Sequence, residues 1–387
     1  MKVSSTIIHE VAKRLFYNHN PSSFDMKTLF RVLILLAVPV FLHPSCRPRD
    51  PDPQGYEQGV MVLNAGNFLD NNGSISFLKR EKSVAENDIF YKANGMSLTG
   101  NVQGYAEASG IGIILVDNST AGQDKIELVS VKDFKRVGSF GAPDIENPRD
   151  ILVVDENTVY VSCWGQTGSF ADFFPNPGYI AVIDLPSKSI RKKIPIDRGG
   201  DRMMRYRDVV FVGNSSDLLF LQEVNLVQER AVRSYRLGPS PQPIGVDAYG
   251  KLWVAYGRVI ARLDGFTRDR EKEFFLTEHP FKRPTLFTMS PDRQQIRFLY
   301  SFFDPNDGFK EKGEVYQFRV LDDQITTSRP VLNKLPSGMG YDMQQGLFYV
   351  GITPSFKQAG HVLRYRSDFS LVDSIQVEIA PSGFYFK

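Results

Sequence analysis

The chain has 387 residues, with 46 Lys and Arg against 44 Asp and Glu, which gives a formal net charge of +2 at pH 7. Residues 1–45 hold five of the basic and two of the acidic side chains, so the remainder has a formal charge of −1. A near-neutral surface excludes general nucleic-acid binding, which needs a basic face. The sequence has only two cysteines, so it lacks the disulfide framework that holds many small secreted domains.

The N-terminal region is typical of an export signal. Residues 1–25 are mixed and polar, and we expect them to be a mis-annotated extension before the true start. Residues 26–45 have a basic beginning and an apolar core of about 11 residues, which is too short to span a bilayer of roughly 30 Å. Cys46 is the predicted lipidation site of a lipoprotein, and the Pro-rich residues 46–58 are a predicted flexible tether. An ordinary signal peptide or an uncleaved anchor is the alternative.

A repeated unit fills the rest of the chain. Each copy has a proline, an apolar strand, a turn and a second strand rich in aromatic residues, followed by two further strands. The clearest copies begin at Asn147, Ser240, Arg283 and Leu335. In three of them a proline stands 12 residues before an aromatic residue: Pro148 before Tyr160, Pro241 before Trp253 and Pro336 before Phe348. Four strands at a period of roughly 38–52 residues are typical of a β-propeller blade.

The two ends of the repeat region complement each other. The first unit, residues 59–98, lacks a strand before GVMVLN, and the segment IAPSGFYFK from Ile379 repeats the Pro-containing first strand and then stops. We therefore expect the C-terminal strand to pair with the N-terminal blade and so remove an unpaired edge. Two weaker copies between the clear ones complete the set. The sequence predicts an all-β, seven-bladed β-propeller over residues 59–387, with six or eight blades as the alternatives.

Ligand binding is predicted at one end of the propeller. The connections between second and third strands, and those between blades, emerge at the same end, and several are long and rich in aromatic residues. Surface loops are usually polar, so aromatic side chains there indicate a contact surface. The predicted ligand-binding residues are Asn64, Asn67, Phe68, Asn118, Arg149, Trp164, Phe170, Phe173, Phe174, Arg205, Tyr256, Arg258, Phe303, Asp304 and Phe356. The alternative is that the rings seal the loops against the blades and that the Asn and Asp side chains cap turns.

Known catalytic motifs are absent from the sequence. No GxSxG or HExxH pattern occurs, and only His279 and His361 lie beyond Cys46, too few for a three-histidine metal site. We therefore expect no enzymatic activity, no metal and no cofactor. An enzyme would need three or more carboxylates or histidines that meet at the mouth of the central channel. Cys163, which lies between apolar residues, is predicted to be a core side chain.

The ends of the repeat region resemble a known family. GVMVLNAGNFLDNNGSISFL, DIFYKANGMSLTGNVQGY and the closing IAPSGFYF resemble the YncE-like (YVTN-type) seven-bladed propeller lipoproteins of Bacteroidota. That family includes surface-exposed propellers that bind cobalamin and pass it to a TonB-dependent transporter. The insertion at residues 165–178 does not match the family's pattern, so a different ligand is left open.

The resemblance implies a function at the outer membrane. It implies a lipid-anchored protein, exposed at the cell surface or else on the periplasmic face, that captures a small nutrient such as a corrinoid. The implied partners are this ligand, a TonB-dependent transporter and the membrane that holds the anchor, with no nucleic acid. Fold alone does not determine function, so two alternatives stand: a propeller enzyme of lactonase or lyase type, and a surface scaffold or adhesion protein.

Overall fold

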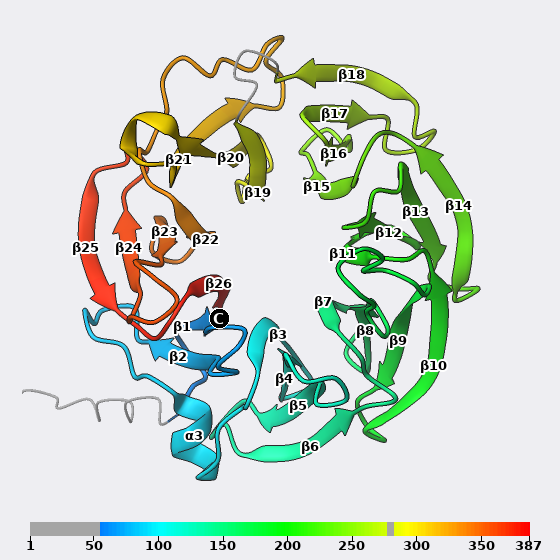
Figure 1. The fold of residues 1–387 in the computed structure, drawn as a ribbon, viewed down its shortest axis with the longest axis vertical. Coiled ribbons are helices and arrows are strands. Elements are labelled where there is room, and N and C mark those ends of the chain that lie inside the picture. The colour runs from blue at the N-terminus through cyan, green and yellow to red at the C-terminus, as the bar shows by residue number, and fades with distance from the viewer. Residues whose placement is uncertain (1–54, 277–281) are drawn as a thin grey trace, which may run out of the picture. The chain divides into compact units, whose positions relative to one another are not determined.

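The computed structural model describes residues 55–276 and 282–387, and these form seven antiparallel sheets arranged in a ring (Figure 1). The predicted signal segment, Cys46, His279 and most of the predicted tether lie outside the described residues. The prediction of an all-β, seven-bladed propeller is confirmed.

Each sheet is one blade, with its first strand nearest the central axis of the ring. Blade 1 contains β26 (Pro381–Phe386), β1 (Val60–Asn64) and β2 (Ser74–Leu78). Blade 2 contains β3 (Asn101–Ala108), β4 (Ile111–Asp117), β5 (Lys125–Ser130) and β6 (Arg136–Gly141). Blade 3 contains β7 (Pro148–Val153), β8 (Thr158–Cys163), β9 (Gly178–Asp184) and β10 (Ser189–Ile196). Blade 4 contains β11 (Gly200–Tyr206), β12 (Val209–Asn214), β13 (Phe220–Asn225) and β14 (Arg230–Arg236).

The remaining blades follow the same plan. Blade 5 contains β15 (Gln242–Val246), β16 (Leu252–Tyr256), β17 (Val259–Leu263) and β18 (Arg270–Phe275). Blade 6 contains β19 (Arg283–Met289), β20 (Gln295–Asp304) and β21 (Lys310–Arg319), with the short 3-10 helix η2 (Pro305–Asp307) between the last two. Blade 7 contains β22 (Pro336–Asp342), β23 (Leu347–Ile352), β24 (His361–Tyr365) and β25 (Leu371–Gln376). The helix α3 (Ile89–Asn94) follows blade 1.

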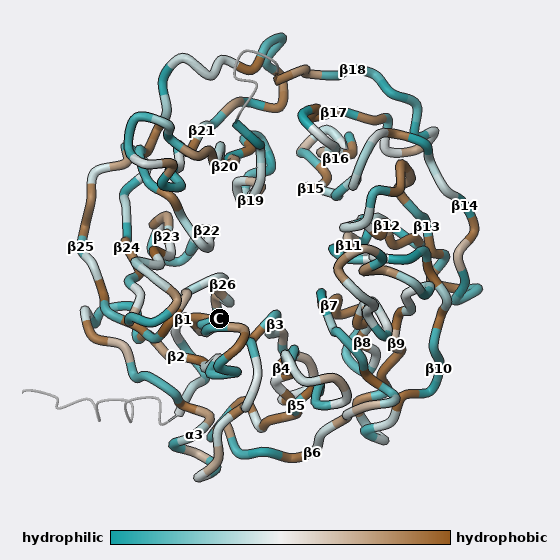
Figure 2. Tube along the Cα trace, viewed as in Figure 1, coloured by the Kyte–Doolittle hydropathy of each residue, from teal (hydrophilic) through white to brown (hydrophobic). Residues whose placement is uncertain are grey.

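Burial explains why the middle strands are so apolar. Strands β4 and β8 are buried on both faces, since each blade packs between two neighbours, and they read as nearly continuous apolar runs. The outermost strands β10 and β14 expose Arg and Lys side chains. Figure 2 colours many residues of these two strands as hydrophilic. Cys163, at the end of β8, is fully buried in an apolar cluster, as predicted.

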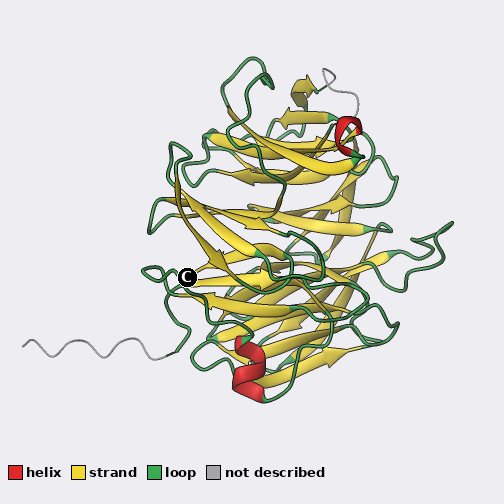
Figure 3. Ribbon diagram, turned by 60° about the vertical axis from the view of Figure 1, so that its left-hand side comes forward, coloured by secondary structure: helices red, strands yellow, loops and turns green. Residues whose placement is uncertain are grey.

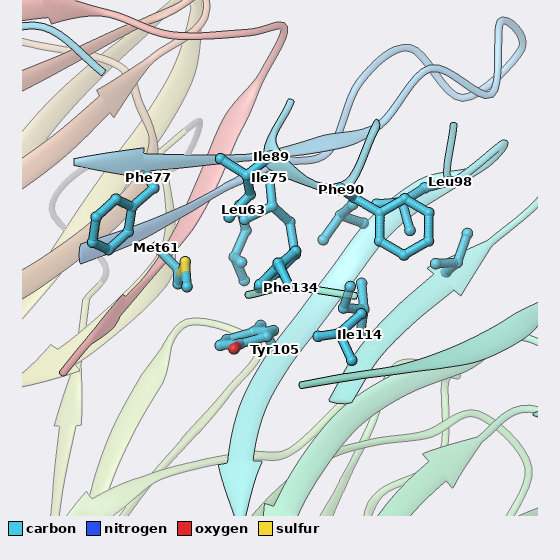
Figure 4. Packing of buried hydrophobic residues seen from close by; sticks show 13 residues of the cluster. Met61, Leu63, Ile75, Phe77, Ile89, Phe90, Leu98, Tyr105, Ile114 and Phe134 are labelled. Atoms are coloured by element: carbon cyan, nitrogen blue, oxygen red, sulfur yellow. The ribbon is translucent and has the colours of Figure 1, made fainter. Parts of the chain in front are cut away.

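Large side chains fill the space between neighbouring blades. Between blades 1 and 2, Met61, Phe77 and Tyr105 pack with Phe90 of α3 and with Phe134 (Figure 4). All five are at most 5% exposed. Complete burial of side chains of this size contributes about 1.5–3 kcal/mol each, so the blade-to-blade contacts stabilise the ring strongly.

The ring closes as the sequence predicts. Strand β26 pairs with β1, with Val60 opposite Phe386 and Val62 opposite Phe384. A buried ion pair reinforces the junction between blades 1 and 7, since Arg80 Nε lies 2.6 Å from Asp342 Oδ2. The packed part of the chain begins slightly before the predicted boundary at residue 59, because the Tyr56 ring contacts Phe77 with 5.1 Å between centroids.

The inner strands share an irregularity that positions the site. Each has a shift of register against the second strand of its blade, as a β-bulge produces. In five blades one residue is skipped at this point in the pairing: Gln103, Arg149, Ile244, Ser337 and Ser382. In blade 4 the skipped residues are Asp201 and Arg202. Because a bulge re-aims the side chain of the extra residue, these positions depart from the regular alternation of a strand.

The repeated proline of the sequence has a structural reason. Pro148, Pro336 and Pro381 each begin an inner strand. A proline has no N–H to donate, so it is tolerated at the first residue of a strand and at the edge of a sheet. The inner strand of every blade provides both conditions.

Candidate functional site

We call the end of the ring that carries the second-to-third strand loops and the loops between blades the loop face. Figure 3 shows loops that extend beyond both ends of the strands. At the loop face of blades 1–3 lies a cavity of about 960 Å³, which we call the blade 1–3 cavity. Its aromatic lining residues are Phe68, Trp164 and Phe173. Its polar lining residues are Asn101, Gln103, Asp117, Asn118, Ser119, Asp124, Glu146, Asn147, Arg149, Gln166 and Thr167.

Arg149 is the most constrained charge in this cavity. It is the skipped residue of β7, and its Nη2 donates to Asp117 Oδ2 at 2.7 Å and to Asn147 Oδ1 at 3.2 Å. The guanidinium lies over the Trp164 ring, 3.6 Å from its centroid. The side chains of Arg149 and Asp117 are only 12% and 3% exposed. A buried, paired and stacked guanidinium of this kind is held in one position.

Asp117, at the end of β4, has an unusual proton affinity. Burial raises its pKa to about 6; the Arg149 guanidinium opposes this rise, and the neighbouring Asp124 carboxylate adds to it. Its Oδ1 has no hydrogen-bond partner among the described residues. Two carboxylates can share a hydrogen bond only when one of them is protonated, so Asp124 provides a partner for Asp117 only after proton uptake.

Asp124 connects two loops of the cavity wall. Its carboxylate accepts the backbone N–H of Asn118 at 2.8 Å and that of Asn147 at 2.9 Å. Asn118 itself donates from Nδ2 to the Thr99 carbonyl at 2.7 Å. Asn147 has a φ of 50°, a left-handed conformation that asparagine adopts more readily than most residues. These contacts fix the loop after β4 and the loop before β7, both of which line the cavity.

The long loop after β8 brings three aromatic rings together. Trp164 makes edge contacts with Phe173 and Phe174, at centroid distances of 6.0 and 5.0 Å, and the two phenylalanines meet each other at 5.0 Å. The loop returns over Arg149 because the Asn147 Nδ2 donates to the Gly165 carbonyl at 2.9 Å. Gly165 has a φ of 74°, which suits the turn that follows Trp164.

Blade 1 also contributes to the wall of the cavity. Phe68 is 48% exposed and lines the cavity. Its loop is fixed to blade 2, because Asn71 Nδ2 donates to Ser119 Oγ at 2.7 Å and the Ser119 N–H donates to Asn71 Oδ1 at 2.9 Å. The loop is also joined to blade 7 by a bond from Asn67 Nδ2 to the Phe356 carbonyl, at 3.1 Å.

The structure brings together about a third of the predicted binding residues. Those that line the blade 1–3 cavity are Phe68, Asn118, Arg149, Trp164 and Phe173. Phe174 packs behind Trp164, and Asn67 caps its own turn by accepting the Leu69 N–H at 3.0 Å. Three polypeptide segments from three blades therefore converge, as the propeller prediction requires.

Several predicted residues lie elsewhere at the loop face. Asn64 is fully buried and donates to Ser76 Oγ at 2.9 Å, which is a structural contact. Phe170 is 103% exposed at the tip of its loop and lines none of the cavities at this face. Phe356 is 60% exposed on the loop of blade 7. The alternative, in which the rings seal the loops and the Asn and Asp side chains have structural contacts, therefore holds for some of the predicted ligand-binding residues.

The remaining predicted residues belong to blades 5 and 6. Tyr256 lines a separate cavity of about 510 Å³, and its hydroxyl donates to Glu273. Arg258 donates from Nη2 to the Leu276 carbonyl at 3.2 Å. Phe303 lines a third cavity of about 680 Å³ on the β20–β21 hairpin. Asp304 is paired with Lys312 at 2.7 Å, which holds the pKa of Asp304 below its usual range.

The prediction that Arg205 belongs to the channel mouth is corrected by the structure. Arg205 lies near the far end of β11 and donates to the carbonyls of Arg207 and Val154, both in turns at the opposite face. The residues of blade 4 that correspond to Arg149 are Asp201 and Arg202, the skipped residues of the β11 bulge. Strand β11 begins at Gly200, so Arg205 lies near its end and not at its entry.

Other buried carboxylates lie close to the central axis. Burial raises the pKa of Asp150 to about 6, although this side chain accepts the Met203 N–H at 2.6 Å. Burial also raises the pKa of Asp201, against the opposing charges of Arg149 and Arg202. Within residues 55–276 and 282–387 no group of three or more His, Cys, Asp or Glu side chains is arranged to hold a metal ion.

Several polar lining residues of the cavity were not predicted from the sequence, and four of them share one position in the fold: Asn101, Asp117, Asp124 and Asn147. All four sit where a strand of blade 2 or 3 begins or ends. A signal was present, since a polar residue directly at the end of an apolar strand marks the loop face. The pairing between Asp117 and Arg149 could not be predicted, because it joins two blades across a bulge.

The fold and the cavity at one end of the ring define the chain as a seven-bladed β-propeller with a polar, aromatic-edged site. It is similar to a quinoprotein alcohol dehydrogenase-like protein from Bacteroides thetaiotaomicron, with a TM-score of 0.58 and 16% identity over 86% of this chain and 78% of that one. It is also similar to hydrazine synthase from Kuenenia stuttgartiensis, with a TM-score of 0.53 and 14% identity over 75% of this chain and 91% of that one.

A third similar structure is the dihydro-heme d1 dehydrogenase NirN in complex with DHE, with a TM-score of 0.53 and 12% identity over 88% of this chain and 77% of that one. At these identities the likeness shows the propeller fold alone. No protein-family model matches the chain, and no curated protein matches it. None of the helices in the described ranges has the length and hydropathy needed to cross a membrane.

Proposed function

We propose that this propeller is a ligand-binding protein that captures a small polar molecule in the blade 1–3 cavity. The observation that carries the proposal is the stack of Trp164 on Arg149, which is fixed by Asp117 and faces a cavity of about 960 Å³. A concave site with apolar rings and a few oriented polar groups is the usual form of a small-molecule site, and this volume lies at the upper end of the usual range.

The predicted export signal at residues 26–45 and the predicted lipidation site at Cys46 support a cellular setting for this capture. In the proposal the propeller is anchored to the outer membrane, exposed to the medium, and passes its ligand to a TonB-dependent transporter. The resemblance to YncE-like lipoproteins supports the transporter and a corrinoid as one ligand to be tested. Phe170, Phe303 and Phe356, which stand exposed at the same face, would then be available to the transporter.

A thermal-shift experiment tests the proposal. The purified protein is heated with corrinoids, haem, neutral glycans and siderophores in turn. A ligand at 100 times its dissociation constant adds about 2.7 kcal/mol to the free energy of unfolding, which raises the melting temperature measurably. The shift should be lost in Phe173→Ala and kept in Phe170→Ala, a change in the same loop outside the cavity. An absence of any shift across the whole panel would remove the capture function.

One observation favours a second candidate, an enzyme. Asp117 combines a pKa of about 6 with a position in the cavity wall, and a carboxyl group with a pKa near the working pH suits general acid–base catalysis. Carboxylates also gather here to an extent that the sequence did not indicate, since Asp124 and Glu146 line the same cavity. Turnover of a lactone or a glycan that disappears in Asp117→Asn while binding persists would establish this candidate.

A further inference from the structure

The charges of the blade 1–3 cavity select against anionic ligands. Three carboxylates line it, those of Asp117, Asp124 and Glu146, against the single guanidinium of Arg149. This guanidinium is already paired with Asp117 at 2.7 Å and covered by the Trp164 ring. A phosphate or carboxylate on a ligand would therefore meet uncompensated negative charge in a partly desolvated space, which is unfavourable.

The polar groups of the wall suit hydroxyl groups. Side-chain amides contribute a large share of the lining, and each amide can both donate and accept, as a hydroxyl group does. Asn101 and Asp117 are 5% and 2% exposed, and each has a side-chain oxygen with no hydrogen-bond partner among the described residues. Buried acceptors without a partner favour a ligand rich in O–H donors, directly or through a bridging water.

The apolar groups of the wall are flat and come from different blades. Phe68 belongs to blade 1 and Phe173 to blade 3, and they are 48% and 44% exposed. Trp164 fixes Phe173 by an edge contact, so this ring is held in place before any ligand arrives. Rigid aromatic rings supply contact area at a low cost in conformational entropy.

A sugar ring combines the properties that these groups select. Its C–H faces are apolar and stack on aromatic rings, while its edge carries hydroxyl groups that each donate and accept. We infer that the blade 1–3 cavity binds a neutral oligosaccharide, with Phe68 and Phe173 against ring faces and with the amides, Asp124 and Glu146 on the hydroxyl groups. This inference rests on the proposed capture function and names its ligand class. The volume of about 960 Å³ accommodates more than one sugar ring.

Calorimetric titration of the purified full chain tests the inference. The probes are neutral cello-, xylo-, manno- and malto-oligosaccharides and N-acetylglucosamine oligomers, with oligogalacturonate as the acidic comparison. We expect at least one neutral probe to bind with a dissociation constant below 1 mM, and oligogalacturonate to bind at least tenfold more weakly. Phe173→Ala should weaken the neutral ligand at least tenfold and Gln166→Ala about threefold to tenfold. Phe170→Ala, from the same loop but outside the cavity, should stay within twofold.

Two further probes separate this inference from the proposed function. Cyanocobalamin and adenosine are titrated under the same conditions, each against the wild type and Phe173→Ala. If either binds in a Phe173-dependent manner while every neutral sugar fails, the capture function stands and the sugar class is overturned. If sugars bind equally to the wild type and to Phe173→Ala, with both variants folded by thermal melting, the assignment to this cavity is overturned. Failure of every probe overturns the sugar class, and the capture function is then decided by the thermal-shift panel, which also contains haem and siderophores.

Discussion

Two loops of the loop face, one in blade 3 and one in blade 6, both carry phenylalanines but hold them in different surroundings. In blade 3, Trp164 and Phe173 pack on each other above the buried Arg149–Asp117 pair. In blade 6, Phe303 and Phe309 are 62% and 68% exposed on a hairpin whose ion pairs face solvent. Aromatic loops alone therefore do not define the predicted site. The buried polar groups contributed by β4 and β7 distinguish the blade 1–3 cavity from the cavity that Phe303 and Phe309 line in blade 6.

Removal of the buried arginine should have the largest effect. Arg149→Ala removes the cation that pairs with Asp117 and opposes the rise in its pKa. The buried carboxyl group must then either stay charged without a partner or bind a proton, so the free energy of unfolding at pH 7 should fall by about 3–5 kcal/mol. The matched change in blade 6, Lys312→Ala, breaks an exposed pair and should cause no measurable loss. Urea denaturation of both variants checks this. Equal losses would show that the two regions do not differ in the way described.

The second prediction concerns pH and Asp117. Its folded pKa of about 6 lies above its ordinary value of 3.8, so the folded state binds a proton that the unfolded state releases between these two pH values. The contribution of this group to stability is therefore greatest below pH 3.8 and is lost as the pH rises to 6. At about 1.36 kcal/mol per pKa unit the loss approaches about 3 kcal/mol.

The variant Asp117→Asn isolates this effect from the other titrating groups. The difference in unfolding free energy between wild type and Asp117→Asn, measured by denaturation at pH 4 and pH 7, should change in favour of the variant as the pH rises. Asp304, whose pKa is lowered, offers the contrast in blade 6, because its stabilising contribution is lost as the pH falls. A difference between wild type and Asp117→Asn that is constant over this range would contradict the raised pKa of Asp117.

Truncation of the tryptophan should have an intermediate effect. Trp164→Ala removes the stack on Arg149 and the contacts to Phe173 and Phe174. Cation–π and aromatic pairs contribute about 0.5–2 kcal/mol each, so a loss of about 2 kcal/mol is expected together with loss of ligand binding. Phe303→Ala in blade 6 should change stability by less than about 0.5 kcal/mol. Thermal melting and calorimetric titration of both variants provide the test.

The smallest effect is expected at the loop tip. Phe170→Ser replaces a ring that is 103% exposed, so the unfolding free energy should stay within about 0.5 kcal/mol of wild type. Affinity for a ligand of the blade 1–3 cavity should also be unchanged. If Phe170→Ser abolishes binding in titration, the ligand reaches beyond the blade 1–3 cavity. The binding site then includes the tip of the loop that follows β8.

Much of the fold could be predicted because it depends on patterns local to each blade. Two-residue alternation, the proline at the start of the inner strands and the repeat of IAPSGFYFK at Ile379 were sufficient for seven blades and their closure. Each of these signals reports on a short segment and on the neighbours directly beside it in the sheet. The prediction of the fold therefore did not require knowledge of contacts between blades.

The site was predicted only in part because it is built between blades. Trp164, Arg149 and Phe68 could be chosen from loop position and residue type, and they do line one cavity. The pairing of Arg149 with Asp117 depends on a bulge in β7, and Arg205 was misplaced because β11 begins at Gly200 and puts this residue near its far end. A register shift of one residue reverses which side chains face the central axis, and alternation in the sequence carries no record of it.

The pairing of β1 with β26 has a consequence for how the protein is made. Val60 can pair with Phe386 only after the other six blades have been synthesised, so blade 1 gains its inner strand last. Contacts so distant in sequence are slow to form, because a very long loop has to be closed first. Until then the nascent chain presents the apolar edge of β1 without a partner strand, so this segment is exposed to chaperones during synthesis for longer than any other strand.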